Sequence, residues 1–324
     1  MSQSYAEQIH SRFKIEESAL EEVVYRATNE AISACERWVR GYMNEVYSVV
    51  TEGGTEVVVR IRRGGDVGFL EEAWAIQQAG LVGVPVAEVL LVDTFNEVDT
   101  PVEVMVQRKV DGTPLPQALE ALTDRQISVL EAEIGLVIGQ LHSIKVGGYY
   151  HLNPGGVWDF ATWDEIASSI RKDRTAEIPY ILECGFTQQE GRTLLGFVHK
   201  LVDEFPCRQP VLCHGDLARD HILVADDGNT IAGLIDFGDF QGGSPMVDMA
   251  DLLKSYPRLR IQGVAQGYPD KSLFERFEVH ETLHNIAFLV GLLPYLTEIG
   301  DTDLLQKNTL LLRQKLDQGL ALVG

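Results

Sequence analysis

Apolar and polar positions alternate in short blocks through residues 211–250. Three apolar runs, at 211–213, 222–224 and 231–235, have the length of buried β-strands. Residues 226–229 are Asp-Asp-Gly-Asn, a turn signal between the second and third runs. The pattern predicts a strand followed by a β-hairpin, with polar loops at the strand ends.

The first hundred residues predict an antiparallel sheet with a packed helix. Residues 17–33 carry an apolar stripe at helical spacing, and residues 69–79 form a second helical pattern that stops at Gly80. Strands are expected at 38–50 (as strand, turn and strand), 57–62, 89–92 and 102–106.

From Thr113 onward the pattern becomes mainly helical. An apolar stripe from Ile127 to Leu141 predicts a long helix, and Asp124 follows Thr123, whose hydroxyl can cap it. Further helices are expected at 158–174, 188–204, 246–256, 273–299 and 303–321, with a loop at 147–156. The elements together predict an α+β chain with two lobes, residues 1–108 and 109–324, and a hinge near 107–112.

Composition is compatible with a cytoplasmic enzyme. The chain has 324 residues, of which 45% are hydrophobic, and no apolar run of about 18 residues that would predict a membrane-spanning helix. The first 18 residues are polar and acidic, so we expect no signal peptide. The four cysteines are scattered and lack a CxxC pair, which favours neither a zinc site nor a disulfide framework.

The net charge of −21 disfavours nucleic acid as a partner, because phosphate binding needs a basic face. Such acidity suits a cationic ligand, but a solvated acidic surface explains it equally well. The candidate acidic residues for a cationic substrate are Asp159, Asp164, Glu165, Glu275, Glu278 and Glu281.

Two carboxylates and a histidine follow the strands of the central stretch. Asp216 comes just after the first strand and Asp236 just after the third, so both can face one site, and His221 can turn back toward it. A base together with metal-binding groups on the nucleotide phosphates is what phosphoryl transfer needs.

At these residues the chain resembles the aminoglycoside phosphotransferases, which have a protein-kinase-like fold. The resemblance is carried by His214-Gly215-Asp216 with His221, by Asp236-Phe237-Gly238-Asp239, and by Gly243-Ser244-Pro245 with Asp248. It implies that Asp216 is the catalytic base and that Asp236 and His221 are ligands of Mg²⁺. The family usually has Asn at the position of His221, and His is found in the branches that include the 2″-aminoglycoside and macrolide phosphotransferases.

The resemblance also implies a nucleotide site in the first lobe. Arg60 stands where kinases place the phosphate-binding lysine, with Arg62 on the same strand face as a rival. Glu72 is expected to pair with this cation, and Glu71 is the alternative. The remaining nucleotide-binding candidates are Gly41 and Asn44 in the first hairpin and Met105, Gln107 and Lys109 near the hinge.

The function implied is phosphorylation of a small-molecule hydroxyl by ATP or GTP. The acceptor favoured is an aminoglycoside or a similar amino-containing natural product; a macrolide, choline, fructosamine or a sugar stays open, as does the choice between antibiotic resistance and metabolism. Only nine positions separate Asp236 from Pro245, which leaves no room for a peptide-binding segment. A catalytically inactive nucleotide-binding scaffold is the alternative of another class.

Overall fold

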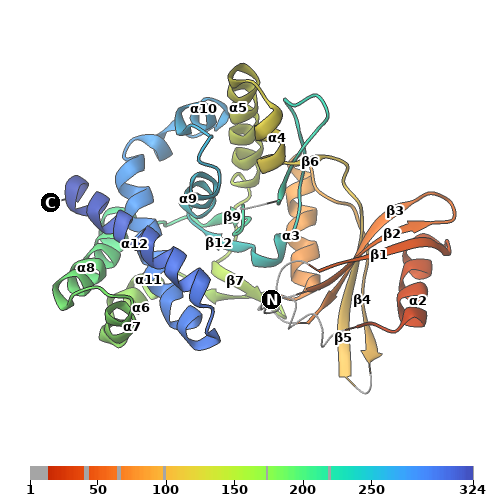
Figure 1. Cartoon of the computed structure of the whole chain (residues 1–324), viewed down its shortest axis with the longest axis horizontal. Coiled ribbons are helices and arrows are strands. Elements are labelled where there is room, and N and C mark those ends of the chain that lie inside the picture. Colours follow the sequence, from red (N-terminus) through yellow and green to blue (C-terminus); the bar gives the residue numbers. More distant parts are fainter. Residues whose placement is uncertain are drawn as a thin grey trace.

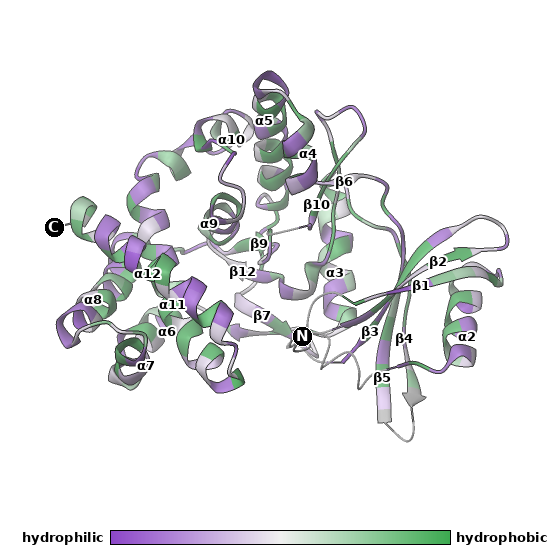
Figure 2. Cartoon of the chain, viewed as in Figure 1, coloured by the Kyte–Doolittle hydropathy of each residue, from purple (hydrophilic) through white to green (hydrophobic). Residues whose placement is uncertain are grey.

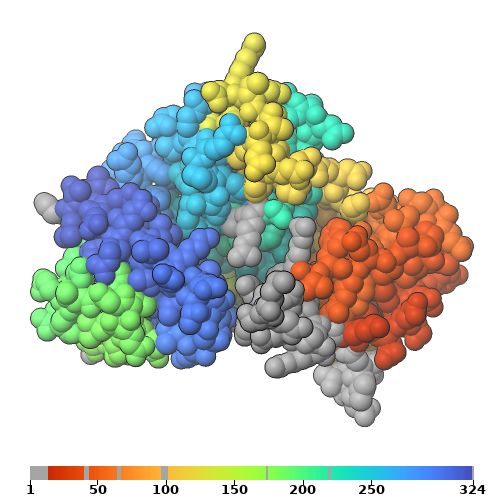
Figure 3. All heavy atoms as spheres, in the orientation of Figure 1, coloured from red at the N-terminus to blue at the C-terminus, as the bar shows by residue number. Residues whose placement is uncertain are grey.

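The computed structural model describes residues 14–39, 44–63, 67–97, 100–172, 174–217 and 220–323. These residues form two lobes, which stand as separate masses in Figure 3, the N-terminal one red to orange and the C-terminal helices green and blue. The expected two-lobed α+β architecture is confirmed (Figure 1).

The N-terminal lobe is built on one five-stranded antiparallel sheet in the order β1-β2-β3-β5-β4. The strand β3 is central, and its alternating burial places Val57, Val59 and Ile61 in the core and Arg60 on the opposite face, as the two-residue period predicts. The strands are β1 (Ile32–Trp38), β2 (Asn44–Thr51), β3 (Glu56–Arg62), β4 (Val89–Glu97) and β5 (Thr100–Arg108).

Two helices accompany this sheet. The helix α2 (Glu17–Thr28) buries Leu20, Val23 and Val24 against it, and α3 (Phe69–Leu81) lies between the sheet and the second lobe (Figure 1). The first helix was expected to continue to residue 33, which is wrong. It ends at Asn29, which adopts a left-handed conformation with φ of 60°, and the following residues pair with β2 as β1.

The C-terminal lobe is organised around α5 (Asp124–Leu141), which begins with a capping box formed by Thr123 and Gln126. The helix α10 (Ile261–Gly267) packs closely on α5, because Gly135 and Gly267 allow the two backbones to approach. The other helices are α4 (Leu115–Ala121), α6 (Trp163–Arg171), α7 (Ile178–Glu183), α8 (Gln188–Glu204), α9 (Met246–Ser255), α11 (Phe277–Ile299) and α12 (Thr302–Val323).

Two small sheets connect these helices to the central stretch, and they correct two expectations. The expected loop at 147–156 contains β7 (Tyr149–Asn153), and the expected helix at 158–174 begins as β8 (Val157–Phe160) before α6 starts. Thr162 and Glu165 form a capping box that sets the start of α6. The sheets have the orders β8-β7-β12-β9 and β11-β10-β6; their other strands are β6 (Thr113–Pro114), β9 (Val211–Cys213), β10 (Ile222–Val224), β11 (Ile231–Leu234) and β12 (Gln241–Gly243).

The helix α11 is apolar on more than one side. Ten of its residues are buried, and it packs against α8, α9 and α12. In the described part of the chain it alone is long and apolar enough to cross a membrane, a test that a core helix also passes. Figure 2 shows apolar residues on both α11 and the sheet of the first lobe.

The contact between α5 and α10 can be tested with two glycines in helix interiors. In Gly135→Ala the new Cβ would lie 2.0 Å from the carbonyl oxygen of Val264, so we expect the free energy of unfolding to fall by about 1–3 kcal/mol. Gly196 in α8 is exposed with no atom within 4 Å of a new Cβ, so Gly196→Ala should stabilise by about 0.5–1 kcal/mol. Urea unfolding measures both, and equal effects would contradict the close packing.

Candidate active site

The central stretch presents its polar residues to a cleft of about 2500 Å³ between the lobes. Asp216 follows β9, and Asp236 follows β11, which pairs with β10 as the predicted hairpin. Both side chains line the cleft, and 35% of the Asp216 side chain and 44% of the Asp236 side chain is exposed. The sequence therefore located two carboxylates that face one open space.

The loop that carries Asp216 is held by the buried carboxylate of Asp248 on α9. Its Oδ2 accepts a hydrogen bond from the backbone N–H of His214 at 2.8 Å, and its Oδ1 accepts one from the N–H of Gly215 at 2.9 Å. The Nε2 of His142, at the end of α5, donates to Oδ2 at 2.9 Å. Burial opposes the charge of Asp248, but the hydrogen bonds from His142 and from the N–H of Gly215 hold its pKa below the ordinary value.

Gly215 is required by the geometry of this loop. Its φ is +83°, and a Cβ there would lie 1.9 Å from the carbonyl oxygen of Asp239. Any side chain would separate the loop of Asp216 from the turn that follows Asp236. The close approach of the two segments that carry the carboxylates therefore requires glycine at position 215.

A second histidine also joins the two segments. The Nε2 of His214 is 3.0 Å from the carbonyl oxygen of Ile235, which can only accept, so Nε2 carries the proton. Its Nδ1 then accepts from the N–H of Asp216 at 3.3 Å. Burial lowers the pKa of His214, so the ring is neutral and serves to hold the backbone.

His221 lies between the two carboxylates. Its Nδ1 is 2.9 Å from the carbonyl oxygen of Asp216 and must be the protonated nitrogen, which leaves the lone pair on Nε2. That Nε2 lies 3.7 Å from Oδ2 of Asp236. The imidazole is fixed in the tautomer that can share a cation with Asp236.

Arg60 reaches both Glu72 on α3 and the turn after β11. It is buried, forms an ion pair with Glu72 and donates from Nη2 to Oδ1 of Asp236 at 2.6 Å. Burial raises the pKa of Glu72, and the nearby Asp236 raises it further against the effect of Arg60. Burial would likewise raise the pKa of Asp236, but the guanidinium of Arg60 beside it holds that pKa below the ordinary value.

The alternatives to the pair of Arg60 and Glu72 were Arg62 and Glu71, and the structure places both outside that ion pair. Arg62 forms an ion pair with Glu103 at 3.2 Å and is absent from the described lining of the cleft, whereas Arg60 lines it. Glu72 is buried, whereas Glu71 is partly exposed. The structure therefore brings together the residues favoured first, and their roles in nucleotide binding stay predictions.

The remaining nucleotide candidates are only partly placed in the cleft. Asn44, Gln107 and Lys109 line it, and Lys109 also forms an ion pair with Glu56. Met105 pairs with Arg60 and lies on the same face of the sheet, but it is fully buried in the cluster that includes Phe69 of α3 and is not among the described lining residues. Gln107, two residues later on this face, lines the cleft instead. Gly41 lies outside the described residues.

Sequence reasoning gave no role to Asp239, which concentrates negative charge at the site. Burial and the neighbouring Asp216 and Asp236 raise its pKa above the ordinary value. Three carboxylates thus crowd into the region around His221. Such crowding favours a bound cation. The only sequence signal for this third carboxylate was the second Asp of the Asp-Phe-Gly-Asp motif.

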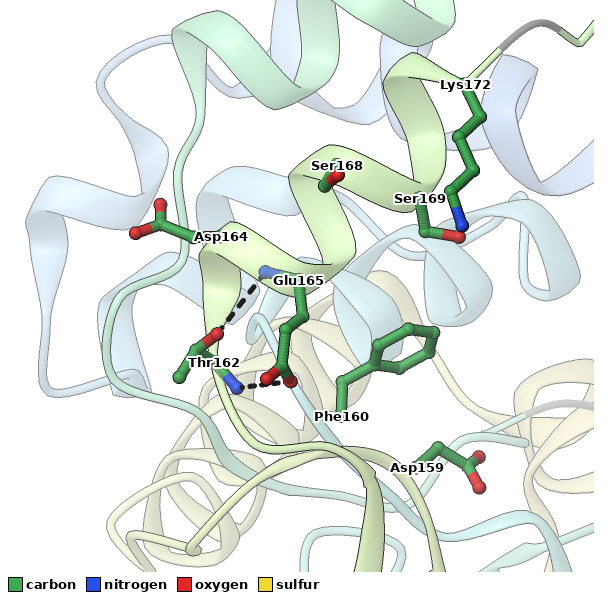
Figure 4. Close-up of a pocket in the computed structure, with 8 residues that line it drawn as sticks. All are labelled: Asp159, Phe160, Thr162, Asp164, Glu165, Ser168, Ser169 and Lys172. Atoms are coloured by element: carbon green, nitrogen blue, oxygen red, sulfur yellow. Dashed lines mark hydrogen bonds between the residues drawn. The ribbon is translucent and has the colours of Figure 1, made fainter.

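The acidic acceptor candidates are scattered over the second lobe. Asp159, Asp164 and Glu165 line a pocket of about 670 Å³ beside α6, which shares Phe160, Ser169 and Lys172 with the main cleft (Figure 4). Glu281 lines the main cleft, whereas Glu275 and Glu278 are absent from its described lining.

Coupling between Arg60 and Glu72 can be measured by a double-mutant cycle. We expect Arg60→Ala to weaken nucleotide binding by at least about tenfold and Glu72→Ala to weaken it less, because Arg60 would contact the phosphates directly. The effects should be non-additive by about 0.5–3 kcal/mol, as for residues in contact. Nucleotide titration of the folded variants measures this, with Arg62→Ala as the control. Strict additivity, or a larger effect of Arg62→Ala, would contradict the pairing.

Comparison with known proteins places the chain in a family. A family model described as the phosphotransferase enzyme family (APH) matches residues 35–281. None of the curated proteins matches.

Solved structures share the fold at low identity. The aminoglycoside phosphotransferase APH(4)-Ia, in a ternary complex with AMP-PNP and hygromycin B, is 16% identical, with a TM-score of 0.70 over 93% of this chain and 99% of that one. The GDP and kanamycin complex of APH(2″)-IIIa is 18% identical, with a TM-score of 0.63 over 93% and 98%. The macrolide 2′-phosphotransferase MphH from Brachybacterium faecium is 18% identical, with a TM-score of 0.56 over 90% and 97%.

These neighbours show the same two-lobed, protein-kinase-like fold, in which a small sheet lobe faces a larger helical lobe. The family model spans well over half of the chain and includes the loop of Asp216, the turn of Asp236 and the strand of Arg60. The protein therefore belongs to the phosphotransferase enzyme family.

Proposed function

We propose that this phosphotransferase transfers the terminal phosphoryl group of ATP or GTP to a hydroxyl group of a small molecule. The observation that carries the proposal is the shared cleft. It places Asp216, which has no ion pair with a Lys or Arg side chain among the described contacts, in the same open space as Asp236 and Arg60. A base and phosphate-binding groups that face one space are the requirements of an in-line transfer.

The steps follow from these positions. Asp216 orients the acceptor hydroxyl and takes its proton as the oxygen bonds to the terminal phosphorus. The bond from that phosphorus to the bridging oxygen breaks, and the nucleoside diphosphate leaves. Arg60, held by Glu72, would place its guanidinium beside the phosphates and stabilise their negative charge.

The donor set near Asp236 fits a divalent cation. The lone pair on Nε2 of His221 and Oδ2 of Asp236 face each other across 3.7 Å, and excess negative charge surrounds them. We assign these two side chains to Mg²⁺, which when bound would neutralise charge on the phosphate oxygens. The Arg60 contact with Oδ1 leaves Oδ2 for that purpose.

The acceptor that the sequence favoured is an aminoglycoside. The names of the similar structures include hygromycin B, kanamycin and a macrolide, each said of that protein alone. An enzyme of this kind would work in the cytoplasm, where nucleoside triphosphates are plentiful. The choice among these compounds depends on the side chains that line the part of the cleft where the acceptor would bind.

Asp216→Asn tests the assignment of the base. We expect kcat to fall by about 10²-fold or more with nucleotide affinity nearly unchanged, because the amide cannot accept the hydroxyl proton in the transition state. Asp226→Asn, in the exposed turn of the same hairpin, is the matched control and should leave kcat unchanged. If Asp216→Asn turns over as fast as the wild type, Asp216 is not the catalytic base. If the wild type binds nucleotide but shows no turnover, the alternative of a catalytically inactive nucleotide-binding scaffold is favoured.

His221→Asn tests the metal assignment. In the wild type a proton competes with the metal for the imidazole, so activity at limiting Mg²⁺ should fall as the pH drops from about 7.5 to 6 and recover at saturating Mg²⁺. The amide of His221→Asn does not titrate in this range, so the variant should retain activity and lose the coupling between pH and Mg²⁺. The measurement is kcat/KM against Mg²⁺ concentration at several pH values. Identical coupling in both proteins would exclude His221 as a ligand.

A further inference from the structure

The helix α11 has an apolar face that the core does not cover. Its core face packs on α8 and α12, and its other face lines the cleft through Phe288, Leu292, Tyr295 and Ile299. These positions follow helical spacing, so they form one continuous stripe. Gly291 lies within the stripe and leaves open space, because a Cβ there would meet no atom within 4 Å.

This face exposes large aromatic side chains inside the cleft. Phe288 is 50% exposed and Tyr295 is 48% exposed, and Tyr150 on β7 adds a third aromatic residue to the lining. Exposed apolar surface concentrated in a cleft marks a binding site more often than a scattered exposed residue does. Because the same cleft contains Asp216, an apolar molecule on this face has access to the phosphoryl-transfer groups.

Most of the acidic residues on the acceptor side of the cleft have a cationic partner. We define this side as the lining residues within 149–205 and 247–315, among which the described acids are Glu177, Asp251, Glu281 and Asp301. Three are in ion pairs, and Asp301 accepts a hydrogen bond from the N–H of Leu304 at the start of α12. The ion pairs are Glu177–Arg174 at 2.6 Å, Asp251–Lys254 at 2.7 Å and Glu281–Lys315 at 2.6 Å.

In the described lining, the cationic side chains of this side outnumber its acids. Lys254, which is paired with Asp251, also lies over the ring of Phe288, with its Nζ 4.8 Å from the ring centroid. Burial lowers the pKa of His284 to about 4, and the charge of Lys254 contributes to the shift, so the imidazole is neutral at pH 7. Lys172 and Lys307 also line the described part of the cleft. A ligand with several amino groups would meet these cations without a free carboxylate for each amine.

The pocket beside α6 offers limited compensation. Asp159 accepts hydrogen bonds from the N–H of His151 and the amide of Asn153, and Glu165 accepts from the N–H groups of Ala161 and Thr162. Figure 4 shows the bonds between Thr162 and Glu165, and it shows Asp164 pointing away from Phe160 and Lys172. These donors are neutral, so the three carboxylates keep their charge, and Lys172 offsets only one of them; this pocket therefore suits one or two amino groups.

We infer that the acceptor is a large, mainly apolar hydroxyl compound with no more than two amino groups, which binds against the cleft face of α11. The inference rests on the proposed function, and it favours an acceptor unlike the polycationic aminoglycosides. The aromatic stripe would supply contact area, and the neutral lining would remove the penalty of burying unmatched charge.

The test compares erythromycin, an apolar lactone with one amine, with the polyamine kanamycin. Calorimetric binding to the full chain with AMP-PNP and Mg²⁺ is measured first, and phosphate transfer from ATP and GTP is measured second. We expect erythromycin to bind at least about 100-fold more tightly than kanamycin. Phe288→Ala and Tyr295→Ala should each weaken erythromycin binding about tenfold, because each removes exposed aromatic contact area. The nucleotide Kd should not change.

Leu310→Ala on α12 is the matched control, because Leu310 is 65% exposed and does not line the described part of the cleft. The inference would be overturned if kanamycin bound more tightly than erythromycin, or if neither compound bound. It would also be overturned if Phe288→Ala and Leu310→Ala weakened erythromycin binding equally. If erythromycin binding depends on Phe288 but no phosphate is transferred, the inference that the α11 face binds the ligand is supported and the proposed function is refuted. The two failures are therefore distinguishable.

Discussion

The geometry of the site depends on one buried carboxylate. Asp248 receives hydrogen bonds from His142 at the end of α5 and from two successive backbone N–H groups before Asp216. A charge buried this deeply is tolerable only when hydrogen bonds stabilise it, and here these bonds join α5, α9 and the loop of Asp216. His214 then connects that loop to the end of β11, so Asp216 and Asp236 are positioned by one continuous hydrogen-bonded unit.

Charge is distributed unevenly along the cleft. Around His221, the carboxylates of Asp216, Asp236 and Asp239 accumulate negative charge, and Arg60 compensates only part of it. On the acceptor side the described acids are paired with cations or cap a helix. The net charge of −21 therefore does not act as a trap for cations at the acceptor side, and a solvated acidic surface accounts for it better.

The helix α11 has two apolar faces, one that packs in the core and one that lines the cleft. One face holds the helices of the second lobe together through residues such as Leu289 and Leu293, and the other presents Phe288 and Tyr295 to the cleft. Such a helix shows little amphipathic contrast, and its length and hydropathy resemble those of a membrane span. Its packing in the lobe explains the composition without a membrane.

Local pattern was enough to determine the central hairpin, the long helices and the face of β3 that carries Arg60. In these elements side-chain periodicity, turn residues and caps act over a few neighbouring positions, so the sequence contains the whole signal. The same applies to Asp216 and Asp236, because a strand end followed by a polar loop is visible without the fold.

Tertiary structure decided what depends on partners distant in the sequence. The strands β7 and β8 are short, and β7 needs β12, which is distant in the sequence, to complete its sheet. Local propensity alone therefore predicted a loop and a helix in their place. Arg60 and Arg62 share a strand face, and only the fold distinguishes them, because it brings Glu72 and Asp236 to Arg60 and Glu103 to Arg62. Whether a carboxylate in the cleft is available to a ligand likewise depends on a cation that only the fold places beside it.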